Sequence, residues 1–177
     1  VQADPGSKPR YCKEKIINTV PETLDEKIWS DIKDKIEISK KNQFSYKIEN
    51  TFRSVGTRLS HYVYKKFLNQ KLKPDTISIK LNGSAGQSLG AFLTSGIKLL
   101  VEGDTNDYVG KGLSGGSIIV RPSSKSKLVS NENTIIGNTV LYGATSGKLF
   151  ASGQAGERFA VRNSGGLAIV EGCGAHG

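Results

Sequence analysis

Two stretches near the start of the chain place apolar residues at helical spacing. The first follows a Thr23-x-x-Glu26 capping-box pattern, in which each side chain can bond the other's backbone N–H. We therefore predict one amphipathic helix over residues 22–39 and a second over about residues 55–68. The apolar residues that share these helix faces are Leu24, Ile28, Ile32, Ile36, Leu59, Val63 and Phe67.

Strict alternation of apolar and polar residues occurs in two short segments. Residues 44–48 alternate Phe, Tyr and Ile with polar positions, and residues 77–81 alternate Ile, Ile and Leu in the same way. This period of two predicts a half-buried strand in each segment. The first twenty residues, with two prolines, a glycine and scattered charge, are typical of a linker.

The second half of the chain repeats. Four Ser-Gly dipeptides, starting at Ser95, Ser114, Ser146 and Ser164, each precede an apolar run and lie 19, 32 and 18 residues apart. A loop-like segment, residues 121–133, accounts for the long interval, so the underlying period is 18–19 residues. No helix fits inside a repeat, which favours a parallel β-solenoid over a meander or sandwich. The expected structural corner glycines, which permit positive φ, are Gly96, Gly115, Gly147 and Gly165.

Composition separates the two halves of the chain. The 177 residues carry a formal net charge of +9, with 21 glycines, two cysteines and no methionine. The lysines of the first half alternate with acids, which is typical of solvated helix faces, so we expect no nucleic-acid partner. No apolar run is long enough to span a membrane, and we expect no membrane partner. The missing methionine indicates a processed chain or a piece of a longer polypeptide.

Several short motifs resemble binding or catalytic sites, but the residues around them do not fit such a site. Residues 110–115 spell GxGxxG, but a strand-like segment follows where a dinucleotide site needs a helix. Asp104, Asn106 and Asp107 lack the spacing of a calcium loop and favour an Asx-type turn. Cys173 and His176 are too few for a metal site and lack the orienting partner of a catalytic pair. We predict no catalytic, cofactor-binding or metal site; the possible interdomain contacts are Arg158 and Arg162.

Four longer segments carry a more specific similarity: GSAGQS, EGDTNDYVGKGLSGG, IIGNTVLYGATSG and GERFAVRNSG. In this order they closely resemble the C-terminal GXGXG domain of the glutamate synthase large subunit. The resemblance covers residues 44–177 and implies a right-handed parallel β-helix. We therefore expect a mainly β fold of 18–19-residue coils, truncated at its C-terminal end, preceded by a linker and helix over residues 1–43. The family usually reads GDHG near the end, where this chain has GAHG.

The resemblance also implies a function. The family converts glutamine, 2-oxoglutarate and a reduced donor into two glutamates, in glutamate biosynthesis and ammonia assimilation. It implies a non-catalytic scaffold that holds the amidotransferase and FMN-binding synthase domains of the same polypeptide in position for ammonia channelling. FMN and an iron–sulfur cluster would belong to the parent enzyme and not to this chain.

Other implications of the resemblance concern partners and location. Further implied partners are a small reductase subunit or ferredoxin. A cytoplasmic location is expected, with a plastid one left open. The alternative is a free-standing β-helix interaction subunit of another enzyme complex, similar to the β-helix subunit of formylmethanofuran dehydrogenase, which shares the glycine pattern.

Overall fold

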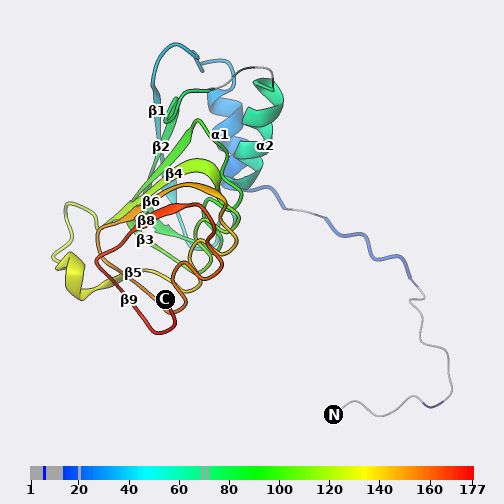
Figure 1. Ribbon diagram of the computed structural model, residues 1–177. Coiled ribbons are helices and arrows are strands. Elements are labelled where there is room, and N and C mark those ends of the chain that lie inside the picture. Colours follow the sequence, from blue (N-terminus) through cyan, green and yellow to red (C-terminus); the bar gives the residue numbers. More distant parts are fainter. Residues whose placement is uncertain (1–5, 7–13, 20, 69, 71) are drawn as a thin grey trace.

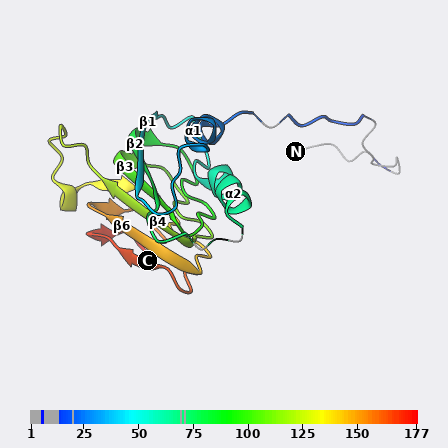
Figure 2. The ribbon, with the colours of Figure 1, turned by 90° about the horizontal axis from the view of Figure 1, so that it is seen from above.

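The computed structural model describes residues 6, 14–19, 21–68, 70 and 72–177. Most of the predicted linker, with Cys12, lies outside these residues. The described part is mainly β, with two helices beside the first strands of a curled sheet (Figures 1 and 2). No described helix has both the length and the apolar character needed to cross a membrane.

The predicted first helix is shorter than expected. Helix α1 (Leu24–Ile32) begins with the predicted capping box at Thr23 but ends well before residue 39. The Asn42 side chain instead bonds the backbone of Glu37, accepting from its N–H at 3.1 Å and donating to its carbonyl at 2.9 Å. These bonds replace helical ones and turn the chain into strand β1 (Asn42–Ile48). Helix α2 (Thr57–Lys66) lies inside its predicted range.

The strands form one sheet in which every pair is parallel, so the antiparallel meander is wrong. Their order is β8-β6-β4-β3-β5-β7-β9; off this path, β2 pairs with β3 and β1 pairs with β2. The strands not yet given bounds are β2 (Ile77–Ala85), β3 (Ile97–Thr105), β4 (Ser114–Arg121), β5 (Thr134–Ile136), β6 (Ser146–Ala151), β7 (Gln154–Ala155), β8 (Leu167–Ile169) and β9 (Gly172–Cys173).

The register confirms the repeat. Lys98 pairs with Ser117, Ser117 with Lys148, and Lys148 with Leu167, which are offsets of 19, 31 and 19 residues. The long offset holds an exposed excursion between β4 and β5 that contains a short 3-10 helix (Ser130–Glu132) and projects from the sheet in yellow (Figure 1). Parallel pairing between consecutive repeats is therefore established for the described strands.

The sheet bends at positions that glycines occupy. β2 and β3 run unbroken through the bend at the paired residues Gly83 and Gly103, which have φ of +130° and +152°. A Cβ on Gly103 would lie 2.0 Å from the carbonyl oxygen of Gly83, so no side chain fits there. Later repeats break at this bend into two strands each. The sheet curls around a core of fully buried side chains such as Ile79, Leu99 and Ile118.

Candidate interdomain surface

A second kind of bend returns the chain to the start of each repeat. It occupies residues 88–92, 108–112, 139–143 and 158–162, and the first, third and fifth residue of each segment have φ between 55° and 67°. A left-handed conformation costs a residue other than glycine about 1–2 kcal/mol. Eight of these twelve positions are not glycine. The bend therefore needs compensating bonds.

Backbone bonds between successive segments supply that compensation. The first residue of one segment donates to the next repeat, as in Thr139 N–H to the Glu157 carbonyl at 2.9 Å. The third donates to the preceding repeat, as in Leu141 N–H to the Val109 carbonyl at 2.8 Å. Because each segment bonds the next one along the chain, the four stack in register, as the adjacent loops in Figure 1 show.

The predicted contact residues Arg158 and Arg162 lie on the outermost of these segments. Both are exposed and left-handed, with φ of 57° and 58°. The Arg162 guanidinium lies 5.9 Å from the centre of the Tyr142 ring in the preceding segment, and the Arg158 N–H donates to the Ala175 carbonyl at 2.9 Å. The backbone thus fixes where both cationic side chains emerge.

The four predicted corner glycines lie where the chain enters the strands after these bends. Gly96, Gly115 and Gly147 have φ of +90°, +112° and +106°. Gly165 is not among the positive-φ glycines, so the conformational reason does not apply to it. A Cβ there would instead lie 2.2 Å from the Thr145 carbonyl oxygen, so close packing of two backbones is what requires glycine.

Side-chain oxygens form a ladder beside the left-handed segments. The Asp107 carboxylate accepts from the Asn138 N–H at 2.7 Å, and the Asn138 amide oxygen accepts from the Glu157 N–H at 2.8 Å. Asn106 likewise caps the Asp107 N–H at 2.7 Å. These oxygens link repeats. Among the described residues, no three His, Cys, Asp or Glu side chains group as possible metal ligands.

The remaining motifs have structural positions. The GxGxxG run at residues 110–115 covers the end of one left-handed segment and leads into strand β4, and not into the helix that a dinucleotide site needs. Cys173 is an exposed free thiol on β9, and the exposed His176 has φ of 60°. His61 lies on helix α2, and the N-terminus of this helix is capped by a side chain that the sequence pattern does not single out.

That group is Asp25, a fully buried carboxylate on α1 that caps helix α2 from outside. It accepts from the N–H groups of Gly56 at 2.8 Å, Arg58 at 2.9 Å and Leu59 at 3.2 Å. Burial raises the pKa of Asp25, and the three backbone bonds oppose that shift. Next to it, Glu26 pairs with Arg58. The two first turns are therefore joined by one polar cluster.

Partial desolvation would raise the pKa of Glu26, but the Arg58 and Thr23 hydrogen bonds outweigh it and lower that pKa to about 2. A second charged cluster lies on the outer face of the sheet, where Glu102 pairs with Lys80 at 2.8 Å and with Arg121. The two cations lower the pKa of Glu102 through hydrogen bonds. Both carboxylates are thus held ionised by neighbouring cations.

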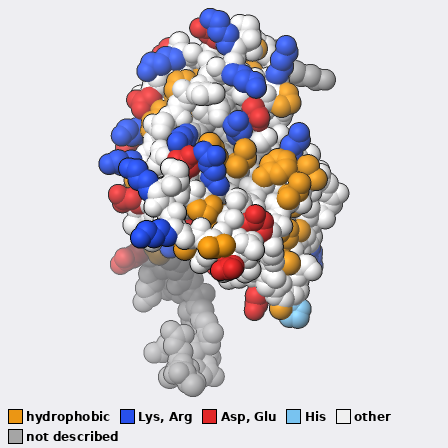
Figure 3. All heavy atoms as spheres, turned by 90° about the vertical axis from the view of Figure 1, so that its left-hand side faces the viewer, with side chains coloured by type: hydrophobic (Ala, Val, Ile, Leu, Met, Phe, Trp, Pro, Cys, Tyr) orange, Lys and Arg blue, Asp and Glu red, His pale blue; other side chains and the backbone are white. Residues whose placement is uncertain are grey.

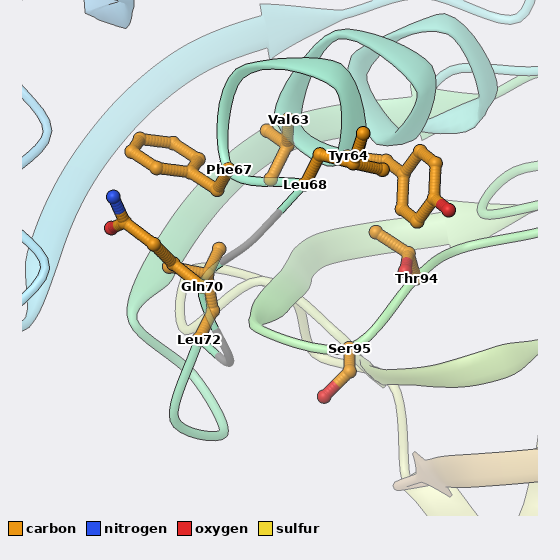
Figure 4. Close-up of a pocket in the computed structure, with 8 residues that line it drawn as sticks. All are labelled: Val63, Tyr64, Phe67, Leu68, Gln70, Leu72, Thr94 and Ser95. Carbon is orange, nitrogen blue, oxygen red and sulfur yellow. The ribbon is translucent and has the colours of Figure 1, made fainter.

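An open groove of about 330 Å³ lies between α2 and the turn before β3 (Figure 4). Val63, Phe67 and Leu72 supply its apolar wall, and the Tyr64 ring and Thr94 face its other side. None of these side chains is acidic or a strong nucleophile. Gln70 and Ser95 also line the groove, so it offers apolar contact together with a few neutral polar groups.

Known proteins share most of this sequence. A family model described as "GXGXG motif" matches residues 25–177, and the chain belongs to that family. It is 60% identical over 176 residues, 99% of this chain and 12% of the relative, to a glutamate synthase (NADPH) large chain of Azospirillum brasilense. It is 50% identical over 146 residues, 82% of this chain and 10% of the relative, to a glutamate synthase (NADPH) large chain of Bacillus subtilis.

A third relative is ferredoxin-dependent glutamate synthase 2 of Synechocystis sp., 51% identical over 132 residues, 75% of this chain and 8% of the relative. The predicted resemblance to the glutamate synthase large subunit is confirmed. The chain spans about a tenth of the length of these curated relatives.

Proposed function

We propose that this chain is the scaffold domain of a glutamate synthase, the enzyme that makes two glutamates from glutamine, 2-oxoglutarate and a reduced donor. The 60% identity across 99% of the chain to a glutamate synthase large chain carries the proposal. Relatives named for NADPH and for ferredoxin match the same segment. This sharing supports a role that does not depend on the electron donor, and the FMN, iron–sulfur cluster and donor-binding groups would lie elsewhere in the polypeptide.

The role we propose is to hold the amidotransferase and synthase domains at a fixed separation for ammonia channelling. Three features support it: the repeats pair with their neighbours in two rows of strands, they bond again at the left-handed bends, and side-chain caps join them. We propose that they wind as a right-handed solenoid over residues 44–177, with α1 in the preceding segment. A stiff spacer fixes the distance between two active sites better than a flexible linker does.

The test uses the full-length enzyme that carries this segment. Gly147→Val places a branched side chain at φ +106°, where even a Cβ would lie 2.6 Å from the Gly116 carbonyl oxygen. We expect glutamine hydrolysis to persist while less glutamate forms per glutamine consumed and free ammonia appears. Gly143→Ala, at a position with open space, should keep the stoichiometry. An unchanged stoichiometry in Gly147→Val, with limited proteolysis showing a loosened domain, would refute the scaffold role.

The free-standing subunit is distinguished by size. An antibody against residues 1–177 should detect a native polypeptide many times larger than 19.0 kDa, co-migrating with glutamine-dependent glutamate formation. A band at 19.0 kDa would support the interaction subunit instead.

A further inference from the structure

An apolar row crosses the outer face of the sheet. Leu100 pairs with Ile119, Ile119 with Phe150, and Phe150 with Ile169, so the four side chains are neighbours on successive strands. We call these four residues the outer stripe. Three are half-buried and Ile169 is 54% exposed. At a strand spacing of about 4.8 Å the outer stripe is roughly 14 Å long.

The outer stripe is not part of the core. Residues that precede its members by one position, such as Leu99, Ile118 and Leu149, are fully buried inside the curl. Successive side chains on a strand point to opposite faces, so the stripe faces outward. A sheet face in water normally carries polar residues, as the outward positions Ser78 and Lys80 of β2 do. The change from polar to apolar therefore begins at β3 and persists through β8.

Cations border the outer stripe. Lys98 and Lys148 lie in the adjacent row, on either side of Ser117. Lys98 lies 3.9 Å from the Asp75 carboxylate, which offsets part of its charge. On the opposite border, Glu102 pairs with Arg121. It also pairs with Lys80, which lies at the β2 end of the stripe row itself, so the three groups together carry one net positive charge. Figure 3 shows hydrophobic side chains close to Lys and Arg side chains, with some Asp and Glu, on the side of the molecule that faces left in Figure 1.

From this juxtaposition we infer that the outer stripe docks a neighbouring domain of the same polypeptide, through an apolar ridge bordered by carboxylates. The inference rests on the proposed function, because only a scaffold within a longer chain has such a neighbour. Apolar side chains in line supply burial, and the flanking lysines select carboxylates at the margin and set the orientation of the partner. A basic or uncharged partner would offer no carboxylate to Lys148, and Lys98 would keep only the Asp75 carboxylate, 3.9 Å away.

The test measures thiol accessibility in the full-length enzyme. Ile119→Cys places a thiol in the outer stripe, and Ser78→Cys places one at an outward, similarly half-buried position on β2. Alkylation is followed by peptide mass spectrometry, so that other cysteines do not interfere. We expect Ile119→Cys to react at least about tenfold more slowly than Ser78→Cys in the native enzyme, and equally in urea.

The charge requirement is tested in the same background. Replacing both Lys98 and Lys148 by Glu should raise the alkylation rate of Ile119→Cys towards that of Ser78→Cys, since it sets like charges against the partner's carboxylates. Replacing both by Gln should have a smaller effect. Equal native rates for the two thiols would overturn the inference, and so would charge reversal without effect. Protection that disappears on dilution would identify a second copy of the chain as the occupant and would also overturn it.

This outcome is separate from the scaffold test. If Gly147→Val uncouples glutamate formation from glutamine hydrolysis while Ile119→Cys reacts freely, the scaffold role is supported and the docking surface is refuted. If Gly147→Val leaves coupling intact although limited proteolysis shows a loosened domain, the scaffold role is refuted whatever the alkylation rates are.

Discussion

Substitutions at two glycines of one repeat can separate the cost of backbone strain from the cost of a steric clash. Gly143 and Gly147 both have positive φ, +67° and +106°, but their surroundings differ. A Cβ on Gly143 meets nothing within 4 Å, whereas one on Gly147 would lie 2.6 Å from the Gly116 carbonyl oxygen and 2.8 Å from a Leu113 methyl carbon. Alanine at Gly143 therefore adds only conformational strain. Alanine at Gly147 adds strain and a clash with a neighbouring repeat.

The magnitudes follow from those contacts. Left-handed strain alone should cost about 1 kcal/mol at Gly143→Ala, and overpacking adds about 2 kcal/mol more at Gly147→Ala. In a chain of this size each kcal/mol lowers Tm by about 3 °C, so we expect losses of about 3 °C and about 9 °C. Thermal unfolding followed by circular dichroism measures both. Equal losses, or a larger loss at Gly143, would refute the argument that close packing of repeats requires glycine at position 147.

Three further predictions concern polar groups. Asp25→Asn turns an amide donor towards an N–H of α2 and should lower the free energy of unfolding by about 1–3 kcal/mol in urea titrations. Because the pKa of Asp25 is raised in the folded chain, its contribution to the free energy of unfolding is largest below pH 3.8 and falls as the pH rises through the native pKa. The Asn variant should lose that pH dependence. The pH dependence from Glu26 has the opposite sign, because its pKa is about 2 in the folded chain against an ordinary value of 4.5. Glu26 therefore stabilises the fold above pH 4.5 and loses that contribution towards pH 2. In Glu26→Gln, the free energy of unfolding should depend less on pH over that range. Asn138→Ala leaves the Glu157 N–H without its cap and should cost about 0.5–2 kcal/mol, whereas equal stability would show that water replaces the amide oxygen.

The strands could be predicted because their signal is local. Inward apolar residues alternate with outward ones, and a Ser-Gly pair marks three of the turns into a strand with positive φ, so the period and most strands emerged from spacing alone. The left-handed segments could not be predicted in the same way. Phe92 and Leu141 adopt φ of 55° and 57° although nothing in their side chains favours it. Their conformation is fixed by backbone bonds to residues a full repeat away, which no sequence window contains.

The helical pair shows a similar limit. The capping box of α1 was predictable because Thr23 and Glu26 lie three residues apart. The cap of α2 was not, because Asp25 lies more than 30 residues before the N–H groups that it binds. The outer stripe was also missed. Its members are apolar residues at outward strand positions, and alternation alone gave no reason to separate them from the core.

The excursion between β4 and β5 shows that this corner of the fold tolerates added length. The repeats before and after it keep an offset of 19 residues, although 31 separate Ser117 from Lys148. Chain length at this corner is thus independent of how the strands stack. Residues can therefore be added or removed at this corner without changing the pairing of the strands. An epitope or fluorophore inserted near Lys125 would report on the domain inside an assembled enzyme while the sheet keeps its register.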